Sequence, residues 1–137
     1  MRKIIAGLVF FTLLLMNCSP QQKPQKICLD NDMLLNCKNV SFDSLINSPA
    51  DYEGKYIELE GYLNWKFEHV GLFKSKTIDS RAGAVSLGMA DTLAKQIDKH
   101  YPNGIREKIS IKGIFNRTNM RFGVFGELNN ITCIEIK

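Results

Sequence analysis

Hydrophobic residues alternate with polar ones through the middle of the chain, from residue 57 to residue 67. The apolar side of this alternation consists of Ile57, Leu59, Gly61, Leu63, Trp65 and Phe67. A two-residue period places these positions on one face of an extended chain, so the pattern predicts one long, half-buried strand. The strand is longer than usual, and Gly61 on its inward face offers a place where it can bend.

The same pattern recurs later in the chain. The segment IELEGYLN (residues 57–64) aligns with ISIKGIFN (residues 109–116), with isoleucine, glycine and asparagine at matching places. A repeat of this length is too short to indicate a solenoid. It fits two bent strands of one small barrel, each with an inward glycine at its corner.

Shorter patterns predict the remaining elements. Residues 69–75 and 82–89 are short apolar segments that contain glycine, and residues 129–137 are the last strand candidate. Residues 41–49 predict a short helix that begins after Ser41 and ends at Pro49. A second helix is predicted within residues 90–104 by an apolar face and its stop signals, namely Leu93, Ala94, Ile97 and Tyr101, then Pro102 and Gly104.

The order of these elements predicts a fold. After the short N-terminal helix, the predicted order is three strands, one helix and two strands. This is the order of the five-stranded OB-fold, whose helix lies between the third and fourth strands. We therefore predict a mainly β protein, with a small five-stranded OB-fold-like barrel, one helix between strands 3 and 4, and a short N-terminal helix.

Three segments carry a resemblance to known proteins: LINSPADYEGKYIELEGYLNWKFE (residues 45–68), GIFN (residues 113–116) and FGELNNITCIEI (residues 125–136). They resemble a group of small uncharacterised bacterial OB-fold-like proteins that are often exported. The likeness covers about residues 42–137. Its motifs are mainly core and turn residues, so the resemblance implies an architecture and no particular reaction.

The N-terminus has the parts of an export signal. Residues 1–3 are a short cationic start, and residues 4–16 are uncharged and apolar. A helix of that length rises only about 20 Å, less than the ~30 Å hydrocarbon core, so it suits a signal peptide better than a permanent span. The apolar run ends at Cys18, with Leu15 three residues before it, and so resembles the lipobox of bacterial lipoproteins. Ordinary secretion, an uncleaved anchor and an unrelated apolar N-terminus are the alternatives.

The lipoprotein resemblance implies a domain organisation and a location. It implies a signal peptide at residues 1–17, cleavage before Cys18 and acylation of that cysteine, which would attach the chain to a lipid bilayer. Residues 19–26 (SPQQKPQK) contain no apolar residue and are typical of a tether. We expect residues 18–40 to form the lipidated cysteine and flexible tether, and residues 41–137 the OB-fold-like domain. The expected location is the bacterial cell envelope, facing the periplasm or the exterior.

Composition and charge describe an ordinary globular domain. Of the 137 residues, 45% are hydrophobic and 23% are charged, which is consistent with one small domain. The 18 Lys and Arg against 14 Asp and Glu give a formal charge of +4, and removal of Arg2 and Lys3 with the signal peptide leaves 16 against 14, or +2. This balance does not favour a polyanionic partner such as nucleic acid.

Three cysteines remain once Cys18 is set aside: Cys28, Cys37 and Cys133. At most one internal disulfide can form, and three pairings are open. Cys28 and Cys37 are the disulfide candidates in an oxidising envelope, with simple free thiols as the alternative, while we expect Cys133 to be packed in a strand. The two histidines are isolated and no C-x-x-C spacing occurs, so we predict no metal site and no cofactor.

No residue pattern indicates catalysis. Glu58 and Glu60 share the outer face of the long strand, where a spacing of roughly 7 Å could hold paired carboxylates. Alternating glutamates are also ordinary solubility patterning on an exposed strand face. No serine or cysteine nucleophile has a histidine nearby in sequence. We predict that the protein is not an enzyme and has no catalytic residues.

A binding function is the better hypothesis. OB-folds bind ligands on the face of strands 2 and 3 and on the flanking loops. The residues expected there are Lys66, Phe73, Lys74, Lys76, Arg81, Arg117, Arg121 and Phe122. Cations interleaved with aromatic rings suit an anionic or stacking ligand, although solvated loop charges would give the same pattern. We expect a binding or adaptor domain that recognises an envelope protein or saccharide, or alternatively an inhibitor or immunity-type lipoprotein that captures a toxin or lytic enzyme.

Overall fold

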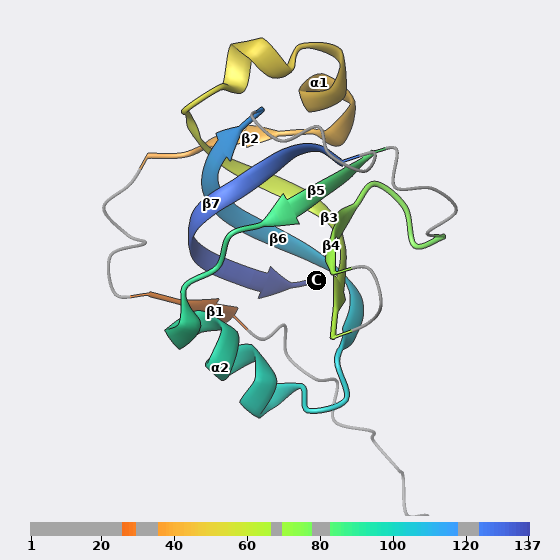
Figure 1. Ribbon diagram of the computed structural model, residues 1–137, viewed down its shortest axis with the longest axis vertical. Coiled ribbons are helices and arrows are strands. Elements are labelled where there is room, and N and C mark those ends of the chain that lie inside the picture. Colours follow the sequence, from red (N-terminus) through yellow and green to blue (C-terminus); the bar gives the residue numbers. More distant parts are fainter. Residues whose placement is uncertain (1–25, 30–35, 67–69, 78–82, 118–123) are drawn as a thin grey trace, which may run out of the picture.

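The computed structural model describes residues 26–29, 36–66, 70–77, 83–117 and 124–137 (Figure 1). The helices are α1 (Phe42–Asn47), the 3-10 helix η2 (Pro49–Tyr52) and α2 (Asp91–His100). The strands are β1 (Lys26–Cys28), β2 (Lys38–Val40), β3 (Tyr56–Trp65), β4 (Gly71–Phe73), β5 (Ala84–Leu87), β6 (Ile105–Asn116) and β7 (Val124–Ile136). The predicted mainly β class is therefore confirmed.

Five of the strands close into a barrel. β3 pairs with β4 on one edge and with β6 on the other, and β6 continues to β7. β7 then lies parallel to β5, which pairs with β4 and completes the circle. The sequence prediction of a small five-stranded barrel is confirmed at this level.

The internal repeat forms one antiparallel ladder. β3 and β6 pair over the whole length of β3, so the segments IELEGYLN and ISIKGIFN lie side by side in opposite directions. Gly61 lies opposite Ile109, and Gly113 lies opposite Ile57. Each glycine therefore faces the isoleucine that begins the other copy of the repeat.

β7 is longer than its sequence pattern predicted. The pattern indicated a strand over residues 129–137, whereas β7 begins at Val124. The register with β6 shifts between Lys112 and Ile114, and Asn130 has a φ of 47°. A bulge of this kind bends a strand without ending it, so the two polar residues Asn129 and Asn130 mark a bend and not a strand boundary.

The two N-terminal strands cover parts of sheet edges that the barrel strands leave open. β4 pairs only with residues 62–64 of β3, and β2 lies parallel to residues 57–59 on the same edge. β5 pairs only with the first part of β7, and β1 lies antiparallel to residues 133–135. Because an exposed strand edge can pair with another chain, this cover protects the sheet.

The folded domain therefore begins earlier than the sequence suggested. Residues 18–40 were predicted to be a tether, but β1 and β2 belong to the sheet. The predicted boundary at residue 41 is too late. A strand of three residues is too short to show an alternating pattern, so neither strand could be recognised before its partner strand was known. The signal peptide and Cys18 lie outside the described residues.

The helices lie at opposite ends of the barrel (Figure 1). The Ser41 side chain accepts a hydrogen bond from the Ser44 backbone N–H and caps α1, which then buries Phe42 and Leu45. α2 buries Leu93 and Ile97. We call these two ends the α1 end, which also carries β2 and η2, and the α2 end, which also carries β1. Within the described ranges, no helix is long and apolar enough to cross a membrane.

The core is built from the inward positions of the barrel strands and from these helix residues. Its largest fully buried side chains are Phe115, Leu45, Ile57, Leu59, Leu63, Leu72, Leu93, Ile97, Ile109, Ile111, Leu128 and Ile131. Ile57, Leu59 and Leu63 belong to the predicted alternation of β3, which is confirmed for these positions, while Phe67 at its predicted end lies outside the described residues. Trp65 ends the alternation half-buried, at the α2 end.

Gly61 lies where β3 packs most closely on its surroundings. A Cβ atom on Gly61 would lie 2.6 Å from Cε2 of Phe42 and 2.8 Å from the carbonyl oxygen of Phe73. A Cβ on Gly113 would lie 2.9 Å from the carbonyl oxygen of Asn129. Since backbone oxygens cannot move aside as a flexible side chain can, both positions need glycine.

Gly61→Ala is expected to lower the free energy of unfolding by about 2–3 kcal/mol, because the added methyl group overpacks the site. Urea unfolding followed by circular dichroism measures the loss. Gly54→Ala is the matched control: nothing lies within 4 Å of its Cβ position, but its φ is +68°. That backbone strain costs about 1 kcal/mol. A smaller loss for Gly61→Ala than for Gly54→Ala would contradict the close packing.

Candidate functional site

Three of the predicted ligand residues lie on loops at the α1 end. Lys74 and Lys76 follow β4, and Arg117 follows β6. Ala84 pairs with Val124, so the loop that leads into β5 and the loop that leads into β7 end side by side. The fold thus brings the β4–β5 and β6–β7 loops together. Arg81, Arg121 and Phe122 belong to these loops but lie outside the described residues.

The other two predicted residues do not join this group. Phe73 is only 5% exposed and is part of the core, so the prediction that its ring faces a ligand is wrong. All three residues of β4 are buried, because this short strand lies between β3 and β5. Lys66 lies at the far end of β3, where its Nζ is 3.3 Å from Oδ1 of Asp98 in α2. The predicted site is therefore divided between the two ends of the barrel.

Apolar and aromatic side chains also lie at the α1 end. Ile46 of α1 is 40% exposed, although its helical spacing matches that of buried Phe42. Tyr52 of η2 is half-buried, and Nζ of Lys38 lies 5.4 Å from the centre of its ring. We define the α1-end surface as Ile46, Tyr52, Lys55, Lys74, Lys76 and Arg117.

Ion pairs and hydrogen bonds hold parts of the α1-end surface in place. Nζ of Lys74 lies 2.6 Å from Oδ1 of Asp43 in α1. The backbone N–H of Arg117 donates to Oε2 of Glu53 at 2.7 Å. Both Lys74 and Asp43 are well exposed, so their pair contributes little to stability and can exchange for a partner's charge. Sequence reasoning missed Ile46 and Tyr52 as surface residues, because their apolar character predicts burial.

At the α2 end, the polar side chains fasten the helix to the barrel. Nε1 of Trp65 donates to Oδ1 of Asp98 at 2.8 Å. This hydrogen bond, with further hydrogen bonding and Coulomb attraction from Lys66, holds the pKa of the Asp98 carboxyl below its ordinary value. These contacts join the end of β3 to the exposed side of α2. Lys66 therefore has a structural partner in this chain.

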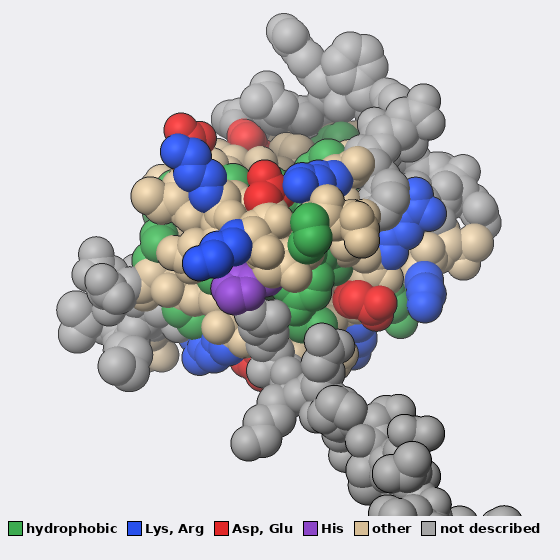
Figure 2. Space-filling model, turned by 90° about the horizontal axis from the view of Figure 1, so that it is seen from below, with side chains coloured by type: hydrophobic (Ala, Val, Ile, Leu, Met, Phe, Trp, Pro, Cys, Tyr) green, Lys and Arg blue, Asp and Glu red, His purple; other side chains and the backbone are tan. Residues whose placement is uncertain are grey.

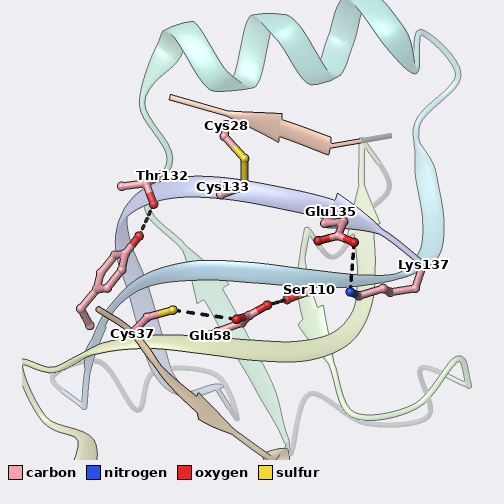
Figure 3. The surroundings of a disulfide bond; sticks show 9 residues. Cys28, Cys37, Glu58, Ser110, Thr132, Cys133, Glu135 and Lys137 are labelled. Carbon is pink, nitrogen blue, oxygen red and sulfur yellow. Dashed lines mark hydrogen bonds and ion pairs between the residues drawn. A yellow bond between two sulfur atoms is a disulfide. The ribbon is translucent and has the colours of Figure 1, made fainter. Parts of the chain in front are cut away.

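Outside the barrel wall, Glu58 accepts hydrogen bonds from two side chains (Figure 3). The hydroxyl of Ser110, itself only 2% exposed, donates to Oε1, and the thiol of Cys37 donates to Oε2 at 3.8 Å. Nucleophilic cysteines typically lie beside positive charges, whereas Cys37 faces a carboxylate. The cluster ties the segment before β2 to β3 and β6. Its geometry supports a structural role.

The same face carries the disulfide, which joins Cys28 to Cys133 (Figure 3). The predicted candidate pair of Cys28 and Cys37 is therefore wrong. Cys28 lies directly opposite Cys133 in the ladder between β1 and β7. Cys37 instead precedes β2, which pairs with β3 on a different edge of the sheet. Spacing along the chain favoured the nearer cysteine, but strand pairing decided the bond.

The described parts of the chain leave few polar groups available for a small ligand. Every buried side-chain nitrogen or oxygen there has a hydrogen-bond partner. In the same residues, His, Cys, Asp and Glu side chains form no group of three that could hold a metal ion. Comparison of the chain with protein-family models, curated proteins and solved structures found no match. The exposed α1-end surface is thus the candidate site.

Replacing both bridged cysteines, as in Cys28→Ser with Cys133→Ser, is expected to lower the free energy of unfolding by about 2–5 kcal/mol. The bond links residues 105 positions apart and so restricts most of the unfolded chain. Thermal unfolding with and without reductant measures the effect. Cys37→Ser is the control, since this residue is not part of the disulfide. An equal loss in the control, or no response of the wild type to reductant, would contradict the assignment.

Proposed function

We propose that this protein is a membrane-anchored lipoprotein whose barrel is a non-catalytic binding or adaptor domain for another envelope component. The α1-end surface is the observation that carries the proposal. It combines three lysines and an arginine with an exposed isoleucine and a half-buried tyrosine. Tyrosine and arginine are enriched at the centres of protein interfaces.

The strand order supports an OB-fold as the scaffold. The closed order of β3, β4, β5, β7 and β6, with one parallel pair, agrees with a five-stranded Greek-key barrel. In this assignment, α2 is the helix between the third and fourth barrel strands. OB-folds use loops at the barrel rim for recognition, and the β4–β5 and β6–β7 loops supply three of the six residues of the α1-end surface.

The kind of partner follows from the surface chemistry. Lysines and an arginine favour an acidic partner, although Asp43 and Glu53 lie among them and balance part of the charge. An exposed isoleucine next to these charges gains little from a saccharide but is stabilised by an apolar contact on a protein. We therefore favour an envelope protein over a saccharide.

The disulfide supports an envelope location. Disulfides persist in oxidising compartments such as the bacterial periplasm and are rare in the cytosol. Cys28 of this bond lies ten positions after Cys18, the proposed lipidation site. An exported chain would form this bond after it crossed the inner membrane. Two acyl chains on Cys18 would then anchor it stably, whereas one gives only marginal binding.

Palmitate labelling tests the anchor. Cells that express the wild type are expected to incorporate labelled palmitate into this protein, and Cys18→Ala is expected to remove the label and release the protein from the membrane fraction. Cys37→Ser is the control, because its thiol lies within the folded domain. Label that persists in Cys18→Ala, or none in the wild type, would overturn the anchor.

Charge reversal tests the binding surface. Lys74→Glu, Lys76→Glu and Arg117→Glu together are expected to lower retention of a partner from solubilised envelope about ten-fold or more, because like charges at an interface are repulsive. A matched pair at the α2 end, Lys95→Glu with Lys99→Glu, is expected to retain the partner. Unchanged retention in the triple variant would remove the α1-end surface from consideration.

A further inference from the structure

The chain enters the barrel at the α2 end. β1 is the first described strand, it begins at Lys26, and it contacts α2 (Figure 1). The Cys28–Cys133 bond fixes β1 to β7 two residues later. The point at which the folded domain meets the N-terminal segment is therefore rigid and lies at one end of the molecule.

The segment between Cys18 and this point is short. Lys26 lies eight positions after Cys18. Even when fully extended, such a segment spans at most about 29 Å. β3 runs from the α1 end to the α2 end with ten residues, a path of roughly 33 Å if it were straight. To set the α1 end on a bilayer, the segment would have to extend almost fully along the whole barrel.

The opposite orientation needs no such extension and places cations near the lipid. Residues 95, 96, 99 and 100 are exposed on α2, while Leu93 and Ile97 face the core. Lys or Arg side chains, a histidine and some Asp or Glu side chains are visible on this end of the molecule (Figure 2). The Lys66–Asp98 pair cancels one charge of each sign. Of the other described charges near this end, Lys26, Lys95, Lys99 and Arg106 outnumber Asp91 and Glu107. Lysines near an anionic membrane surface are attracted to it.

We propose that the α2 end lies against the membrane surface, on anionic lipid headgroups, and that the α1-end surface points away from the membrane. This inference rests on the proposed anchor at Cys18. The disulfide enforces the orientation. Without it, three-residue β1 could detach, and the first remaining strand, β2, begins twenty residues after Cys18. The barrel could then move up to about 70 Å from the anchor and turn over.

The sole tryptophan of the chain, Trp65, reports on this orientation, because it lies at the α2 end beside Asp98. The full-length protein is expressed, purified from membranes and reconstituted in vesicles of phosphatidylcholine and phosphatidylglycerol that contain a dansyl-labelled lipid. Energy transfer from Trp65 to the dansyl headgroups is expected to be efficient. Trp65→Phe combined with Tyr52→Trp moves the donor to the α1 end, and its transfer is expected to be several-fold weaker.

Two further variants separate the contributions of the bond and of the charges. Cys28→Ser with Cys133→Ser is expected to lower transfer from Trp65 although the protein stays on the vesicles. Lys95→Gln with Lys99→Gln is expected to lower energy transfer on anionic vesicles only. Each lysine lost should reduce the population of the membrane-facing orientation roughly five-fold. Lys55→Gln with Lys76→Gln, at the α1 end, is the matched control and is expected to have no effect.

The outcomes distinguish this inference from the proposed function. Equal transfer from the two tryptophan positions, or stronger transfer from the α1 end, in protein that floats with the vesicles would overturn the orientation and leave the anchor intact. Absence of palmitate together with failure to float would overturn the anchor and this inference with it. The orientation would also be overturned if the Lys55 and Lys76 control lost as much energy transfer as the Lys95 and Lys99 variant.

Discussion

The close approach at two glycines, Gly61 and Gly113, is the constraint on which the rest of this structure depends. β3 and β6 pair along all of β3, and a barrel of only five strands closes when such long strands bend. The Phe73 carbonyl lies close to Gly61 and the Asn129 carbonyl close to Gly113, where no side chain fits. Because both copies of the repeat carry the glycine at the same place, one ladder contains both close approaches.

The edges of the sheet depend on how long the barrel strands are. The bent strands β3 and β7 are too long for β4 and β5 to cover, so parts of their edges stay open within the barrel. β1 and β2 fill those parts, although each has only three residues. Short strands hold poorly by backbone hydrogen bonds alone, and Cys28–Cys133 adds a covalent link to one of them. The integrity of the sheet is thereby coupled to the redox state of its surroundings.

The two ends of the barrel differ in what their polar groups do. At the α2 end, Trp65 and Lys66 both bond to Asp98 and fix the helix. At the α1 end, the Lys74–Asp43 pair is exposed, and Ile46 remains in contact with water. Several contacts to one carboxylate hold α2 in place, whereas the more exposed charges at the α1 end are available to a partner. A tether attached at the α2 end would leave that second surface accessible.

The sequence by itself indicated the long barrel strands, the two glycines that need close packing and the residue ranges of the two α-helices, because alternation, glycine placement and capping at Ser41 act over a few neighbouring residues. It did not determine that Phe73 is buried, that β7 continues through Asn130, or that Cys28 bonds to Cys133. The sequence analysis also placed Lys66 and Lys74 in one candidate site, although the barrel holds them at opposite ends. Only the tertiary structure decided these points, since each depends on which distant strand lies alongside, and the local pattern of residues contains no information about that neighbour.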